Sequence, residues 1–188
     1  IYGTFINFKG NTPETEGNKS YIFTLNGKKE AGGTNPDKPE TPQTGKELSI
    51  DGQVVTLTAA NTEVGTETLT YEVKTLGETD IKTLTSINLA EGLKMTFDAG
   101  GEQNAPAYFA KYHNVRMYKN NGFTITGNKK IAKVILDCDK FKTDVYVGNT
   151  TATVSFNGNS VTYKNVFSEP KGGGVQMRIL KVTVVYAK

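Results

Sequence analysis

Hydrophobic and polar residues alternate in short runs between Leu93 and Asp137. The gaps between these runs are rich in Gly, Asn and Lys, and such segments favour turns. A period of two that is interrupted by turns predicts β-strands joined by hairpins. We therefore expect this stretch to form the strands around which a β-rich domain is built.

Two further patterns extend the strands on either side of this stretch. Leu48–Ile50 and Val54–Leu57 flank Asp51-Gly52, a dipeptide that favours a type I′ hairpin turn. Alternate residues of the closing strand are also apolar, namely Val175, Met177 and Ile179, followed by Val182 and Val184. All five can face the core only if an extra residue is accommodated near Leu180–Lys181, so we expect a β-bulge there.

One segment has helical features. Ala105–His113 carries Pro106 at a first-turn position, and Asn104 before it is able to cap a helix. The segment predicts about two helical turns at most. Elsewhere, many short strands with regular turns indicate an all-β fold, and we expect residues 47–188 to form an antiparallel β-sandwich of the jelly-roll or immunoglobulin-like kind.

The first part of the chain is predicted to be separate from this sandwich. Residues 1–30 contain two strand-like pieces, which either join the later sheet or are the remnant of a preceding domain. Residues 31–46 carry Pro36, Pro39 and Pro42 and no large apolar residue, which is typical of a semi-rigid linker. We place the domain boundary in this linker.

Charge and hydropathy exclude two classes of partner. The chain has 22 Lys and Arg residues against 19 Asp and Glu, and no basic run that would line one face, so we expect no nucleic-acid partner. No apolar run reaches the roughly 20 residues of a membrane span. The sequence begins at Ile1 within a strand-like pattern, so we expect targeting information, such as a lipid anchor, upstream of Ile1.

Residues suited to catalysis or metal binding are scarce. His113 is the single histidine and Cys138 the single cysteine, so neither a usual zinc site nor a Ser–His–acid triad is predicted. We expect no catalytic residues, no cofactor and no enzyme activity. Cys138 falls at an inward-facing strand position, so we expect it to be reduced and buried, and its acidic neighbours disfavour a reactive thiol. Asp98–Glu102 and Asp137–Asp139 offer part of a calcium site, although acids beside strands are more often solvated turn residues.

Aromatic, amide and guanidinium side chains gather around the predicted short helix. The candidate ligand-binding residues are Asn104, Tyr108, Tyr112, Arg116 and Tyr118. Aromatic rings stack on sugar rings, and amide or guanidinium groups bond to hydroxyls, so this cluster suits a carbohydrate site. The alternative is that Tyr108 and Phe109 plug the end of the sandwich and that Arg116 pairs with an acid, since large aromatics are chiefly core and interface residues.

Short motifs then follow one another in a particular order. They are Thr96-Phe97-Asp98, Gly100-Gly101, Asn104–Phe109, Val115–Tyr118, Phe123–Thr126, Ile131–Ile135, Ser160–Tyr163 and Arg178–Val182. In this order, and over about half of the chain, they resemble a β-sandwich module of secreted and lipid-anchored proteins of Bacteroidetes bacteria. Members of that family often have a Trp-containing segment before the Ser-Val-Thr strand, where this chain has Thr150–Val154.

The resemblance implies an extracellular or cell-surface module, associated with the outer membrane, that is not itself an enzyme. It brings no catalytic residues. We therefore expect a non-catalytic binding or adhesion module on a bacterial surface protein, with a glycan or another surface protein as its partner. An accessory domain of a secreted hydrolase is the alternative, which the Pro-rich linker and the start of the sequence at Ile1 favour.

Overall fold

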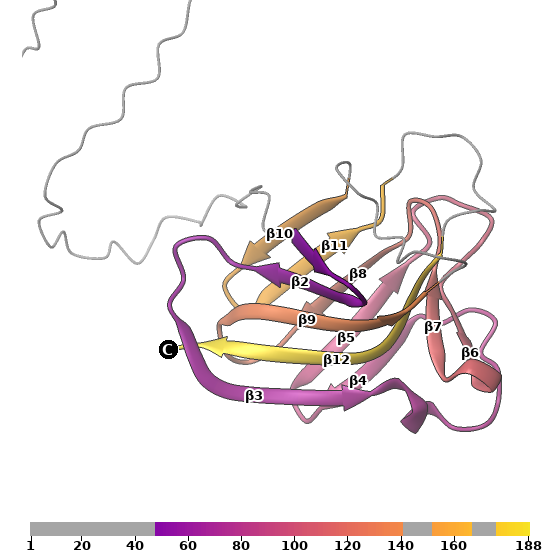
Figure 1. Ribbon diagram of the computed structural model, residues 1–188, viewed down its shortest axis with the longest axis horizontal. Coiled ribbons are helices and arrows are strands. Elements are labelled where there is room, and N and C mark those ends of the chain that lie inside the picture. The colour runs from indigo at the N-terminus through magenta and orange to yellow at the C-terminus, as the bar shows by residue number, and fades with distance from the viewer. Residues whose placement is uncertain (1–47, 141–151, 167–175) are drawn as a thin grey trace, which may run out of the picture. The chain divides into compact units, whose positions relative to one another are not determined.

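Two antiparallel β-sheets pack against each other in the computed structural model, which describes residues 48–140, 152–166 and 176–188 (Figure 1). The prediction of an all-β antiparallel sandwich is confirmed. The predicted strand pair in residues 1–30 and the linker in residues 31–46 lie outside the described residues. In the described part of the chain the helices are two single turns, η1 (Val73–Leu76) and η2 (Ala110–Tyr112), and neither could cross a membrane.

The larger sheet has seven strands and is organised around its last one. Its order is β1 (Leu48–Asp51), β2 (Val54–Thr58), β9 (Ile131–Asp139), β12 (Met177–Ala187), β7 (Asn114–Met117) and β6 (Ala107–Phe109), with β3 (Val64–Glu72) also paired to β12. One edge of β12 pairs with β9. The other edge is shared, because β7 pairs with Met177–Ile179 and β3 with the residues from Lys181 onward.

The smaller sheet has five strands. Its order is β10 (Thr153–Asn157), β11 (Ser160–Lys164), β8 (Gly122–Thr126), β5 (Leu93–Asp98) and β4 (Ser86–Ala90). The register aligns one hydroxyl residue from each strand into a row across the sheet: Ser155, Thr162, Thr124, Thr96 and Ser86. Cross-strand hydroxyl pairs of this kind stabilise a solvated sheet face.

The hydrophobic core lies between the two sheets. Alternate residues of the strands point inward and are almost fully buried, among them Leu57, Met95, Met117, Ile125, Leu136, Val161 and Val184. Within the core, the rings of Phe123 and Tyr163 stack with their centroids 5.2 Å apart. Cys138 is also part of the core and has a free thiol, so its predicted burial is confirmed.

The predicted irregularity in the closing strand is present. The pairing of β12 with β9 shifts register between Ile179 and Lys181, which leaves Leu180 as the extra residue. Met177 and Ile179 before the bulge and Val182 after it are therefore all buried. The bulge near Leu180–Lys181 is confirmed, whereas Val175 lies outside the described residues.

The first hairpin forms where predicted but with a different turn. Asp51 pairs with Val54, so the two central residues are Gly52 and Gln53 rather than Asp51 and Gly52. Gly52 alone of these has a positive φ, of 58°. One glycine in the first central position is the pattern of a type II′ turn, so the type I′ prediction was wrong.

The helix predicted over Ala105–His113 was also wrong. Ala107–Phe109 forms strand β6, and only the single 3₁₀ turn η2 follows it. The Tyr108 amide donates to the carbonyl of Ile81 at 2.9 Å and the Ile81 amide donates back at 3.0 Å, while β7 pairs on the other side. Two extended partners satisfy the backbone of this segment, so tertiary pairing overrides the local helical signals.

Candidate functional site

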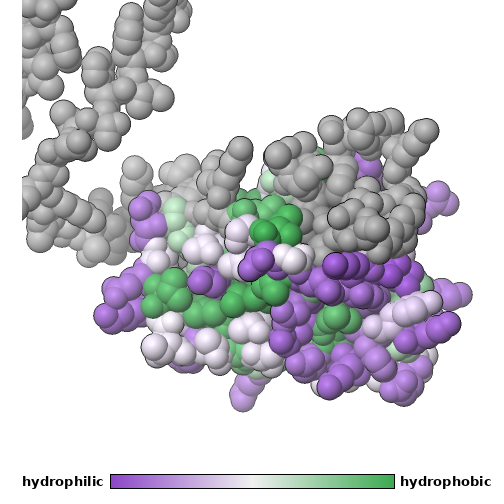
Figure 2. Space-filling model, in the orientation of Figure 1, coloured by the Kyte–Doolittle hydropathy of each residue, from purple (hydrophilic) through white to green (hydrophobic). Residues whose placement is uncertain are grey.

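The five candidate residues separate into three groups. Tyr112 in η2 and Arg116 in β7 come together beside Phe109 of β6. Tyr108 is buried beneath them, and Asn104 and Tyr118 belong to a loop network. We call Phe109, Tyr112, Arg116 and Arg178 the Arg116 surface. In Figure 2 the part of the molecule over β6 and β7 is largely hydrophilic, with a smaller hydrophobic area within it.

Tyr108 is a core residue. Its side chain is 1% exposed, and its hydroxyl donates to the carbonyl of Gly77 at 2.7 Å. The Nδ1 atom of His113 lies 3.5 Å from the same hydroxyl. Burial, and then the carboxylate of Glu78, raise the pKa of this tyrosine. The core interpretation of the aromatic cluster therefore applies to Tyr108, whose ring is not available to a ligand.

Tyr112 is presented to solvent by the η2 turn. Asp80 accepts a hydrogen bond from the Ala110 amide at 2.8 Å and fixes the start of the turn. His113 ends the turn with a left-handed φ of 48°, and its amide donates to the Ala110 carbonyl. The Tyr112 side chain is 46% exposed, and it is the only aromatic among the exposed large hydrophobic residues that the structure describes.

Arg116 lies against both aromatic rings of the surface. Its guanidinium carbon is 3.8 Å from the centroid of Phe109 and 5.0 Å from that of Tyr112. Its Nε donates to the Oδ1 of Asn114 at 3.4 Å. The guanidinium is thus held by stacking, the arrangement that arginine favours on aromatic faces.

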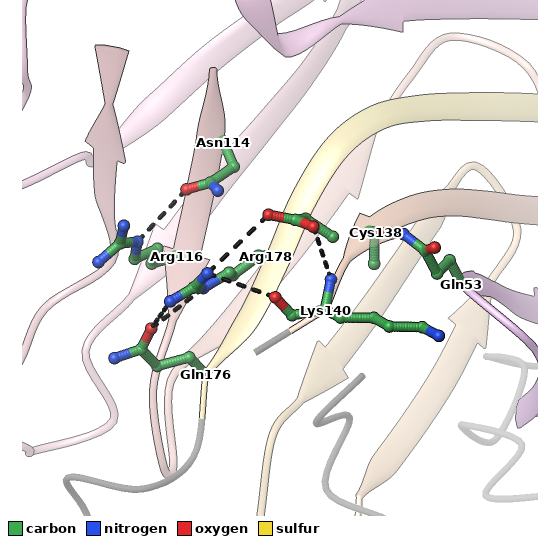
Figure 3. Close-up of polar contacts among 8 residues, drawn as sticks. Gln53, Asn114, Arg116, Cys138, Lys140, Gln176 and Arg178 are labelled. Carbon is green, nitrogen blue, oxygen red and sulfur yellow. Dashed lines mark hydrogen bonds and ion pairs between the residues drawn. The ribbon is translucent and has the colours of Figure 1, made fainter. Parts of the chain in front are cut away.

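Arg178 faces Arg116 across the pairing of β12 with β7, as Figure 3 shows. Its Nε and Nη2 donate to the Oε1 of Gln176, and its Nη1 donates to the carbonyl of Lys140 at 3.3 Å. Asp139 forms an ion pair with it at 3.9 Å. Burial and the charge of Arg116 lower the pKa of the Arg178 guanidinium, and Asp139 opposes them.

Asn104 and Tyr118 contribute mainly backbone groups. The buried side chain of Asn121 donates to the carbonyl of Asn104 at 2.9 Å and accepts from the amide of Tyr118 at 2.8 Å. Asn165, which is equally buried, donates to the Tyr118 carbonyl at 3.2 Å. These amides fix the loops that precede β6 and follow β7, and so they hold the strands that carry the Arg116 surface.

The acids that suggested calcium have other partners. Asp98 accepts from the Gly100 amide at 2.9 Å, and Asp137 forms an ion pair with Lys181 at 2.5 Å. Asp139 is the partner of Arg178 described above. Over residues 48–140, 152–166 and 176–188, no three His, Cys, Asp or Glu side chains gather in a way that could hold a metal ion.

Sequence reasoning missed Arg178 as the cross-strand neighbour of Arg116, and Gln176 as the residue that holds Arg178. The alternation of Met177 and Ile179 indicates that Arg178 points outward. However, nothing local to β12 says that β7 lies next to it, because that pairing joins distant parts of the chain. The signal that was available is the outward charge on a strand in which the residues on either side of Arg178, Met177 and Ile179, are core residues.

Comparisons of this chain with models of protein families, with curated proteins and with solved structures gave no match.

Proposed function

We propose that this chain is a non-catalytic extracellular binding module and that it binds a glycan at the Arg116 surface. The observation that carries the proposal is the exposed ring of Tyr112, which is 46% exposed next to a guanidinium. An aromatic face with adjacent polar groups is the chemistry of small-ligand recognition, in which the ring supplies contact area and polar groups fix orientation.

The surroundings of Tyr112 support binding rather than a reaction. The groups gathered here are ring faces and hydrogen-bond donors, and they come from three strands of the larger sheet and from one short anchored turn. A surface held in this way loses little conformational entropy when a ligand binds. The resemblance to Bacteroidetes surface modules supports a place for this chain on a bacterial cell surface.

Replacing Tyr112 with Ala tests the proposal. We expect wild type to be retained by at least one polysaccharide in a glycan-array or affinity-electrophoresis screen, and Tyr112→Ala to lose that retention. The melting temperature should change little, because substitutions at exposed positions usually shift stability by no more than about 0.5 kcal/mol. Retention and melting are measured on the same preparations.

Ile50→Ala is the matched control, since Ile50 is 47% exposed on β1 of the same sheet. It removes a comparable exposed apolar side chain and should leave glycan retention unchanged. If wild type binds no glycan of any class, the proposal is wrong and another surface protein becomes the better candidate partner.

A further inference from the structure

Two arginines face each other on the outer side of the larger sheet with one carboxylate beside them. Arg116 and Arg178 are direct cross-strand neighbours, and Asp139 is the neighbour of Arg178 on β9. Like charges placed directly opposite one another destabilise a sheet. Among the described residues, Asp139 forms an ion pair with Arg178, and the next acid along β9, Asp137, forms one with Lys181. None of the ion pairs between described residues involves Arg116, so its guanidinium has no carboxylate partner in the part of the chain that the structure describes.

The same place has more hydrogen-bond donors than acceptors. Arginine carries five N–H donors. Arg116 uses its Nε to bond to Asn114, and its Nη1 and Nη2 groups have no hydrogen-bond partner among the described residues. The Nδ2 group of Asn114, in the same network, is buried and also lacks a partner among the described residues. A ligand that supplies acceptor oxygens would satisfy the Arg116 donors.

Two cations lie near the exposed ring. Arg116 is 5.0 Å from the centroid of Tyr112, and the Nζ of Lys111 is 5.4 Å from it. A ligand that touches this ring therefore meets positive charge, which favours an anion. The side-chain geometry of arginine matches the two oxygens of a carboxylate, with which it forms paired hydrogen bonds.

We propose that the ligand is an acidic polysaccharide whose sugars carry carboxylates, with Arg116 binding the carboxylate while Tyr112 contacts the sugar ring. This inference rests on the glycan-binding function proposed above and narrows its substrate class. Arg178 acts as a positioning residue: Gln176 and the Lys140 carbonyl hold its guanidinium, and its charge adds to that of Arg116.

A pair of polysaccharides that differ only in the carboxylate tests this. Polygalacturonate should retain the protein, and the methyl ester of the same polymer should retain it about tenfold less, because the neutral ester has no charge to pair with the guanidinium and cannot accept the paired hydrogen bonds that a carboxylate accepts. Equal retention by both polymers, or retention only by neutral glycans, would overturn the acidic ligand and leave the glycan-binding function intact. Binding to no glycan would overturn both.

Variants separate recognition by Arg116 from general attraction of a basic protein to a polyanion. Arg116→Lys keeps the charge but loses the planar pair of donors, and it should weaken polygalacturonate binding about tenfold. Lys94→Ala removes one exposed charge from the smaller sheet and should leave binding unchanged. Full binding by Arg116→Lys, or a loss in Lys94→Ala as large as the loss in Arg116→Lys, would mean non-specific attraction by charge and would contradict the proposal. If Arg116→Lys does not fold, the comparison of polygalacturonate with its methyl ester still tests whether the ligand must be acidic.

Discussion

Tyr108 and Tyr112 lie close in sequence, yet the fold gives their rings opposite environments. Tyr108 faces inward from β6 and is 1% exposed, whereas the η2 turn reverses the direction of the chain and leaves Tyr112 on the surface. Because η2 is a single turn between two strands, neither helical nor strand periodicity applies across it. Sequence periodicity therefore could not say which of the two rings is available to a ligand.

The two tyrosines should respond differently to truncation. Tyr108→Ala should lower the free energy of unfolding by about 3–5 kcal/mol, the usual loss for a buried large aromatic residue. Tyr108→Phe keeps the ring and removes only the hydroxyl, which bonds to the Gly77 carbonyl and contacts His113, so the free energy of unfolding should fall by about 1 kcal/mol. Urea denaturation followed by circular dichroism measures both values. A Tyr108→Ala variant as stable as wild type would contradict the core assignment.

Cys138 should be unreactive in the folded protein. Its thiol is 1% exposed, and burial together with the charges of Asp137 and Asp139 raises its pKa well above the usual value. Since the thiolate is the reactive form, a thiol reagent should label the native protein slowly and the protein in denaturant quickly. Cys138 is the single cysteine, so labelling reports on this position alone. Fast labelling without denaturant would show that the site opens readily.

At the scale of elements, the bulge in β12 lets both halves of the strand direct their apolar side chains into the core. Met177 and Ile179 are in one phase of the alternation and Val182 and Val184 are in the other, and Leu180 is the residue that joins the two phases. Without the bulge, the uninterrupted alternation would expose either Met177 and Ile179 or Val182 and Val184 to solvent. The sequence contains this information directly, which is why the bulge could be predicted.

Deleting Leu180 should therefore be tolerated. The shortened strand reads as a regular alternation that keeps all four apolar residues inward, so the fold should survive with a melting temperature a few degrees lower at most. Deleting Thr183 instead leaves the bulge and moves Val184 out of the core, or else brings Lys181 into it. That variant should unfold at a much lower temperature or fail to fold. Thermal melts of both deletion variants test the assignment of Leu180 as the extra residue of the bulge. Equal decreases in melting temperature would contradict that assignment.

The segment around β6 is an element whose structure could not be predicted from its local sequence. Pro106 and Asn104 are genuine local signals for the start of a helix. The backbone of Tyr108 nevertheless pairs with Ile81 in one direction and with β7 in the other. Both partners are distant in sequence or separated by a turn, so only the assembled sheet reveals them.

At the scale of the whole molecule, the fold class could be predicted and the arrangement of strands could not. Alternation and turn residues are local properties, and they correctly indicated an antiparallel sandwich. The order of strands depends on pairings between distant segments, such as β2 with β9 and β12 with β3. Arg178 reaches the Arg116 surface only through such a pairing, so this part of the candidate site was beyond sequence reasoning.

The sharing of β12 among three strands also matters for how the protein is made. β3, β7 and β9 are all synthesised before β12, which pairs with each of them. At about 5–20 residues per second, roughly 2–10 s pass between the appearance of Asp139 and that of Ala187. For that time the nascent chain carries strand edges whose partner does not yet exist, and such edges recruit strands from other chains. The edges of β3, β7 and β9 that β12 covers are therefore the places where an unfinished chain would be open to pairing with another chain.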